Sequence, residues 1–216
     1  MAHPKINPSK NTIIFDFGNV LLNLNFKRCV EQFQDVLNVD FSPGLPEKTK
    51  EVMYKYDRGH ISSEAFLWHL QQYNPSAEIR DIIAAWNSFL TPVPMYRFEM
   101  IESLRDRFNI VMLSNINDLH IELIHRDLEQ RLGIEDFHST YFDVVYYSCR
   151  IGMRKPDQEI YEYVQSQLGV NGKDILFIDD MAINIEACQK AGWHGVVHDP
   201  KTEIKDEIEG YVGVLE

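Results

Sequence analysis

Short runs of apolar residues that end abruptly in polar residues recur along this chain. The first run covers residues 12–15 and stops at Asp16. Later runs of the same kind cover residues 109–113, 175–178 and 195–197. Their apolar residues are continuous rather than alternating, which is typical of strands buried on both faces of a sheet. The pattern therefore predicts a buried sheet whose strands are each followed by polar residues.

Segments with helical periodicity lie between the predicted strands. They cover residues 100–108, 119–132, 158–168 and 183–191, and each has Gly, Asn or Asp near one end. Strands that alternate with helices at this spacing favour a doubly wound parallel sheet. We therefore expect an α/β fold with a Rossmann-like core.

The segment between the first and second predicted strands breaks this alternation. It contains no convincing strand, and it closes with Thr-Pro-Val-Pro at residues 91–94. Four helix-length patterns fill it, at residues 26–37, 46–56, 62–73 and 77–89. We expect a small all-helical insertion over residues 25–94, with residues 1–24 and 95–216 forming the core.

Polar side chains follow three of the predicted strands at the point where each strand ends. They are Asp16, Ser114 and the pair Asp179 and Asp180. Ligands of a parallel sheet bind beyond the carboxyl ends of its strands, so these side chains should converge. Crowded carboxylates repel one another unless a hard cation lies among them, and Mg2+ prefers one or two carboxylates with water and phosphate. The sequence predicts a magnesium and phosphate site.

A cation is expected at the same site. Lys155 lies in a polar turn, residues 152–157, that leads into a predicted helix. An ammonium group fixed there can neutralise a phosphate oxygen and keep an attacking carboxylate ionised. Each of these residues alone is weak evidence, but the four features in this order point to one site.

Composition narrows the range of partners. Of 216 residues, 21 are Lys or Arg and 33 are Asp or Glu, which gives a net charge of −12. Nucleic-acid binders usually carry the opposite balance, because their affinity comes from neutralising phosphates. No run approaches the roughly 20 apolar residues of a membrane span, and three cysteines without a CxxC pattern suggest neither a disulfide framework nor a zinc site. We expect a cytoplasmic protein, a monomer or weak homodimer, with no nucleic-acid or membrane partner.

The polar motifs resemble, in order, those of the haloacid dehalogenase-like hydrolase superfamily. The matching stretches are residues 15–21, 113–115, 154–157 and 177–180, together with Asn184. The helical insertion is similar to the small cap of that superfamily's subclass I members. Within the superfamily, the motifs look most like the branch that contains bacterial α-D-glucose-1-phosphate phosphatase.

The resemblance implies a role for each matched residue. Asp16 would be the nucleophile that attacks phosphorus to form an aspartyl-phosphate, Ser114 would hydrogen-bond the phosphoryl group, and Lys155 would balance charge. The implied cofactor is Mg2+ and the implied substrate is a small phosphorylated molecule. The implied metal ligands are Asp16, the backbone carbonyl of Gly18, Asp179 and Asp180, and the implied substrate contacts are Asn19 and Asn115. Of the two neighbouring aspartates, the resemblance favours Asp180 as the direct ligand.

Gly18 departs from the superfamily's usual pattern. Most of its phosphatases have a second aspartate two residues after the nucleophile, which protonates the leaving oxygen and later activates water. Gly18 offers only its backbone carbonyl, so the carboxyl group that would act as general acid and then as general base is missing. General acid–base help contributes about 10²- to 10⁴-fold in rate. We therefore expect a slow enzyme, a substitute donor or an easy leaving group, and a sugar 1-phosphate fits the last option.

These observations favour a Mg2+-dependent phosphatase that hydrolyses a small phosphomonoester, with sugar phosphates as the expected subclass. A 2-haloacid dehalogenase would explain Gly18 but not the acidic pair. A degenerate member that binds a ligand or protein without turnover is the third possibility. Substrate choice should depend on the helical insertion. Its candidate pocket residues are the turn at residues 56–60, Trp86, Asn23 and Asn25, although Trp86 is expected in the insertion's own core.

Overall fold

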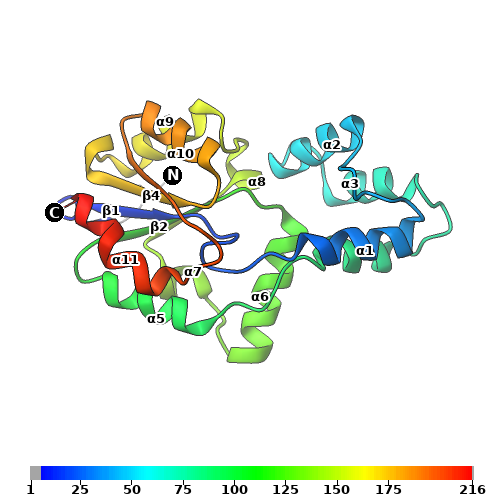
Figure 1. Ribbon diagram of the computed structural model, residues 1–216, viewed down its shortest axis with the longest axis horizontal. Helices are drawn as coiled ribbons and strands as arrows, with labels where there is room; N and C mark the ends of the chain where they lie inside the picture. Colours follow the sequence, from blue (N-terminus) through cyan, green and yellow to red (C-terminus); the bar gives the residue numbers. More distant parts are fainter. Residues whose placement is uncertain (1–5, 216) are drawn as a thin grey trace.

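The computed structural model describes residues 6–215, which form two units side by side (Figure 1). The larger unit is built on a parallel sheet, which has five strands in the described part of the chain, in the order β3-β2-β1-β4-β5. The strands are β1 (Thr12–Phe15), β2 (Asn109–Ser114), β3 (Val144–Tyr147), β4 (Ile175–Asp179) and β5 (His194–Val197). The α/β fold with a doubly wound parallel sheet is therefore confirmed.

Helices cover both faces of the sheet and also form the smaller unit. The smaller unit contains α1 (Phe26–Leu37), α2 (Glu47–Asp57), α3 (Ser63–Gln71) and α4 (Ile79–Asn87). The larger unit contains α5 (Met95–Leu104), α6 (Asp118–Leu132), α7 (Phe137–Tyr141), α8 (Ser148–Ile151), α9 (Gln158–Leu168), α10 (Ala182–Lys190) and α11 (Ile204–Val212), with short 3-10 turns η1 (Gly172–Asp174) and η2 (Gly213–Leu215).

Alternate residues of each central strand pack into two separate cores. In β1, Ile13 and Phe15 join the core formed with α5, α6, α7 and α11, whereas Ile14 joins the core formed with α9 and α10. Figure 1 shows these two groups of helices on opposite sides of the sheet. Burial on both faces is the reason that these strands are continuously apolar.

The structure corrects the sequence prediction in several places. The edge strand β3 was not predicted, because its first two residues are only half-buried and the run is short. Helix α5 begins at Met95 rather than at residue 100, directly after Pro94, which suits the start of a helix. The short helices α7 and α8 and the C-terminal helix α11 were also missed.

The smaller unit has a hydrophobic core of its own. Its buried members include Phe33, Tyr56, Phe66, Leu70, Ile82 and Trp86. Two connecting segments join this unit to the sheet and lie side by side, since Leu24 pairs with Leu90 and the Asn25 amide donates to the Phe89 carbonyl at 2.7 Å. We call residues 26–89 the helical unit.

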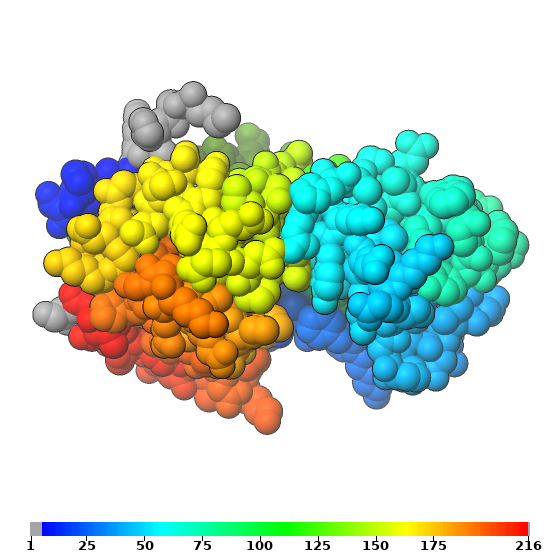
Figure 2. Space-filling view, turned by 90° about the horizontal axis from the view of Figure 1, so that it is seen from above, coloured from blue at the N-terminus to red at the C-terminus, as the bar shows by residue number. Residues whose placement is uncertain are grey.

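The helical unit also contacts the larger unit on the side away from these connections. Arg58 pairs with Asp157, and the Leu119 amide donates to the Tyr56 hydroxyl at 3.3 Å. Gly59, at φ +66°, lies so close to the Cys149 carbonyl oxygen that a Cβ atom there would be 2.1 Å from it. Figure 2 shows the helical unit, coloured from blue to blue-green, directly against residues near 150. The two units therefore meet on both sides of the space between them.

A separate observation concerns membranes. Within residues 6–215, every helix is too short or too polar to span a bilayer.

Candidate active site

The carboxyl edge of the sheet brings the predicted acids together. Asp16 follows β1, while Asp179 ends β4 and Asp180 follows it. One carboxylate oxygen from each of the three lies within 4.8 Å of the others. The strand order reverses between β1 and β4, which is where ligands bind in open α/β sheets. Ser114, the last residue of β2, lines the same cavity.

Lys155 lies among these carboxylates. Its Nζ is 2.8 Å from Asp16 Oδ1 and 2.7 Å from Asp179 Oδ2, and its side chain is 1% exposed. Burial alone would lower the pKa of Lys155, but the two carboxylates together raise it above its ordinary value. Lys155 therefore carries a buried positive charge that two acids share.

One shared cation does not offset the full charge of the cluster. Burial raises the pKa of Asp16 to about 7, although Lys155 opposes this shift, and burial also raises the pKa of Asp180. A divalent cation beside these oxygens would favour their ionised forms. Carboxylates at this spacing, open to a cavity large enough for water, are the donors that Mg2+ takes. The residues present therefore fit a magnesium ion.

The two neighbouring aspartates are held differently. Asp179 accepts hydrogen bonds at both carboxylate oxygens, from the Met181 amide, the Asn184 side chain and Lys155, at 2.7–2.9 Å. Asp180 accepts one hydrogen bond from another side chain, from Asn19 Nδ2 at 2.9 Å. Asp180 therefore has more capacity left for a metal ion than Asp179.

The two asparagines predicted as substrate contacts line the cavity but are already hydrogen-bonded within the protein. Asn115 bonds both backbone polar groups of Lys155, at 2.8 and 2.9 Å. Asn19, at φ +57°, bonds Asp180 through its amide nitrogen, and its oxygen accepts from the Leu24 amide at 3.0 Å. Each side chain fixes a neighbouring part of the site, and contact with substrate stays a prediction.

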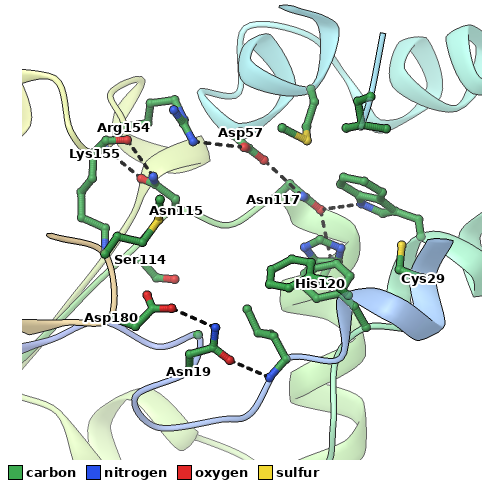
Figure 3. Close-up of a pocket in the computed structure, with 18 of the residues that line it drawn as sticks. Asn19, Cys29, Asp57, Ser114, Asn115, Asn117, His120, Arg154, Lys155 and Asp180 are labelled. Atoms are coloured by element: carbon green, nitrogen blue, oxygen red, sulfur yellow. Dashed lines mark hydrogen bonds and ion pairs between the residues drawn. The ribbon is translucent and has the colours of Figure 1, made fainter. Parts of the chain in front are cut away.

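A cavity of about 620 Å³ opens from this site toward the helical unit. Figure 3 shows Ser114, Lys155 and Asp180 on one side of it, and His120 and Cys29 on the other. The predicted site residues Asp16, Gly18, Asn19, Ser114, Asn115, Lys155 and Asp180 line it, whereas Asp179 is fully buried behind Lys155. The cavity thus joins the acidic cluster to the space beneath the helical unit.

The helical unit contributes one carboxylate, Asp57, to the lining of this cavity. Asp57, the last residue of α2, pairs with Arg154 at 3.9 Å and accepts a hydrogen bond from Asn117 at 3.4 Å. Burial raises the pKa of Asp57 to about 6, although Arg154, Asn117 and Arg58 oppose the shift. The contact depends on the two units being together, since the three side chains come from both.

Sequence reasoning did not identify Asn117 and His120 as cavity residues. Asn117 caps α6 through its side-chain oxygen, which accepts from the His120 amide. A polar cap three residues after Ser114 was the available signal, since it starts a helix at the carboxyl edge of the sheet. Trp86, which the sequence offered both as a core residue and as a pocket residue, is buried in the core of the helical unit and also lines the cavity.

His120 makes the stability of the fold sensitive to acid. Burial lowers the pKa of His120 to about 3, while an unfolded histidine titrates near 6.5. Below about pH 6.5, His120 therefore binds a proton in the unfolded state but stays neutral in the folded state. Stability then falls as pH falls toward 3. We compare the free energy of unfolding of the wild type with that of His120→Phe. As pH is lowered from 6 to 4, the wild-type value should fall relative to the variant by about 1.4 kcal/mol per pH unit. Urea unfolding at several pH values measures this difference, and parallel curves would contradict it.

Comparisons with known proteins identify relatives of this arrangement. A family model described as a haloacid dehalogenase-like hydrolase matches residues 10–192. The D-ribitol-5-phosphate phosphatase of Bacteroides thetaiotaomicron is 24% identical over 183 residues, which cover 84% of this chain and 88% of that protein. Drimenol cyclase drtB of Aspergillus calidoustus is 25% identical over 210 residues, 93% of this chain, but the chain spans only 36% of that protein.

A solved structure is similar over nearly the whole chain. It is a HAD family enzyme from Bacteroides thetaiotaomicron, the wild-type protein in complex with magnesium and inorganic phosphate. The two chains are 27% identical, with a TM-score of 0.79, over 90% of this chain and 97% of the other.

Proposed function

The chain belongs to the haloacid dehalogenase-like hydrolase family, and from that premise we propose that it is a Mg2+-dependent phosphatase that hydrolyses a small phosphomonoester through an aspartyl-phosphate. The observation that carries this proposal is the cluster of Asp16, Lys155 and Asp180 at the carboxyl edge of the sheet. The magnesium and phosphate bound to the similar Bacteroides thetaiotaomicron enzyme also support it.

In the proposed reaction, a carboxylate oxygen of Asp16 attacks phosphorus while the bond from phosphorus to the ester oxygen breaks. The ester oxygen takes a proton from solvent and leaves as an alcohol, because Gly18 supplies no acid. Water then attacks the phosphorus of the aspartyl-phosphate and loses a proton to solvent, which releases inorganic phosphate and restores the Asp16 carboxylate. Ser114 donates a hydrogen bond to the phosphoryl oxygens, and Lys155 stabilises their negative charge. Asn115 is a positioning residue, because it fixes the backbone of Lys155.

We assign the metal site to Asp16, Asp180 and the backbone carbonyl of Gly18. When bound there, Mg2+ would supply positive charge to the phosphoryl oxygens. Asp179, whose two oxygens are already hydrogen-bonded, would act mainly by holding Lys155 and Asn184 in place.

The helical unit is proposed to act as the cap of this site, corresponding to the insertion predicted over residues 25–94. Its contacts with the core at Arg58 and Asp57 support this role, because they place it over the mouth of the site. A cap excludes water and adds contacts to the part of the substrate that does not react. A cytoplasmic location and a monomeric or weakly dimeric state stay predictions.

The sugar phosphate subclass and the α-D-glucose-1-phosphate phosphatase branch stay predictions from the sequence. The relative named as a D-ribitol-5-phosphate phosphatase supports a polyol or sugar phosphate. The dehalogenase alternative gains no support from the site, since a metal-free reaction on carbon gives no role to Asp180 beside Asp16. The ligand-binding alternative predicts binding of phosphate without turnover.

The test is phosphate release from a panel of sugar phosphates, nucleotides and an aryl phosphate, in Mg2+ or in EDTA. We expect release that needs Mg2+. Binding of phosphate without release from any ester would instead favour a binding module, and chloride release from a 2-haloacid without metal would favour a dehalogenase.

Replacing Gly18 with aspartate would supply the acid that the superfamily resemblance leads us to expect there, but we expect no general gain in rate. A Cβ atom at Gly18 would lie 2.8 Å from Leu24 Cδ1, so the Leu24 side chain, in the connection to the helical unit, must shift. We expect kcat for the aryl phosphate to fall or to stay within about threefold of wild type, short of the roughly 10²-fold or more that general acid–base help can contribute. An increase of 10²-fold or more across the panel would contradict this reading of Gly18.

A further inference from the structure

The part of the cavity lined by the helical unit is a chamber formed by residues of α1, α2, α4 and the loop over residues 38–46. Apart from Asp57 at the end of α2, its wall side chains are hydrocarbon, aromatic or sulfur-containing. They include Val30, Phe33, Phe41, Leu45, Met53 and Trp86.

Polar groups near the chamber are mostly engaged with one another. The Asn117 side chain accepts from Trp86 Nε1 and donates to Asp57, each at 3.4 Å. Asp57 in turn pairs with Arg154. Among the described residues, the buried cavity-lining atoms left without a hydrogen-bond partner are His120 Nε2 and Arg154 Nε. The chamber therefore offers few polar contacts to a ligand.

The rim of the cavity is also apolar. Phe26 and Met181 line it, although 58% and 52% of their surfaces are exposed. Phe26 is stacked on Phe89, with ring centroids 5.3 Å apart. Large apolar side chains left exposed around an apolar cavity are typical of a binding site for an apolar group.

A polar ester group, such as a sugar or polyol, and an apolar ester group would bind differently in this chamber. A sugar or polyol exchanges the hydrogen bonds of each hydroxyl with water for contact with hydrocarbon, which opposes binding. A hydrocarbon or aromatic group gains from leaving water, in proportion to the area it buries.

We infer that the phosphomonoester taken by this site carries an apolar ester group, aromatic or aliphatic, which occupies the chamber while its phosphate lies at Asp16. This inference rests on the proposed phosphatase function and names its substrate class. It replaces the sugar phosphate expected from the sequence, because the wall has too few polar groups for several hydroxyls. One or two polar groups on the ester could meet His120 Nε2 and Arg154 Nε.

The experiment measures kcat/KM for 4-alkylphenyl phosphates with methyl, propyl and pentyl chains, in Mg2+. The phenol oxygens of this series are almost equally good leaving groups, so differences report contacts of the chain. We expect kcat/KM to rise about fourfold per methylene until the chamber is filled. Ribitol 5-phosphate and pentyl phosphate, both primary alkyl esters, form a second comparison in which pentyl phosphate should be favoured.

A variant of the wall tests the position of the chain. Val30→Asn should lower kcat/KM for the pentyl compound about five- to tenfold more than for phenyl phosphate. Val197→Asn is the matched control, because Val197 is 49% exposed at the end of β5 and does not line the cavity. Inhibition of the wild-type protein by methyl- and pentylphosphonate gives the same comparison without any substitution.

The outcomes separate the two proposals. The apolar ester group would be overturned by a preference for ribitol 5-phosphate. It would also be overturned if kcat/KM and inhibition did not change with chain length. In both cases phosphate release would still support the phosphatase. No phosphate release from any ester would overturn both.

Discussion

Asp16→Asn should abolish phosphate release while leaving the fold intact. The amide cannot act as the attacking carboxylate, so the covalent route is lost, and losses on removing a catalytic nucleophile reach at least about 10⁴-fold in kcat. The substitution is nearly isosteric, and Lys155 keeps its contact with Asp179 at 2.7 Å. Circular dichroism and the unfolding midpoint should therefore stay close to wild type. Phosphate release in Mg2+ is the measurement.

Asp206→Asn is the matched control for this substitution. Asp206 lies exposed in the first turn of α11 and does not line the cavity. The control should keep wild-type activity. Turnover by Asp16→Asn within tenfold of wild type would contradict a covalent mechanism at Asp16.

Lys155→Met should destabilise the protein strongly as well as stop turnover. Lys155 is the partner of two buried carboxylates, and removing one member of a buried ion pair costs about 3–5 kcal/mol because it leaves charge uncompensated. Methionine fills a similar volume, so a packing defect contributes little to this loss. Denaturant unfolding in EDTA measures the free energy of unfolding.

The same substitution at an exposed lysine separates charge burial from loss of a lysine in general. Lys27, whose side chain is 85% exposed, pairs with Glu31 across one turn of α1 at 3.7 Å. Such surface pairs contribute about 0–1 kcal/mol, so Lys27→Met should change stability little. Equal unfolding midpoints for Lys155→Met and wild type would show that Lys155 does not compensate the acidic cluster.

The strands that form the centre of the sheet could be predicted because burial on both faces leaves a continuous apolar run, as in β1 and β2. The edge strand β3 has no such run, since Val144 and Val145 are only half-buried and it pairs on one side with β2. The bounds of the four helices of the helical unit could be predicted to within two residues.

The acidic site could be predicted because its residues follow strand ends, and parallel strands bring those ends together. What each residue does there depends on contacts between distant segments. The amides of Asn19 and Asn115 lie at predicted site positions, yet each is engaged in hydrogen bonds within the protein. Asp180 differs from Asp179 in its hydrogen bonds and in its burial, neither of which the sequence shows.

By itself, the sequence determined the α/β fold, the helices of the insertion and the clustering of polar residues at the strand ends, because local periodicity and the order of polar residues express them directly. Only the tertiary structure decided what surrounds that polar cluster. Phe33 and Phe41 look like ordinary core residues along the chain, and they do pack together and against Trp86. Their other faces meet a cavity that exists because the helical unit lies over the edge of the sheet. A hydrophobic pattern records that a side chain avoids water, but not whether protein or ligand covers it.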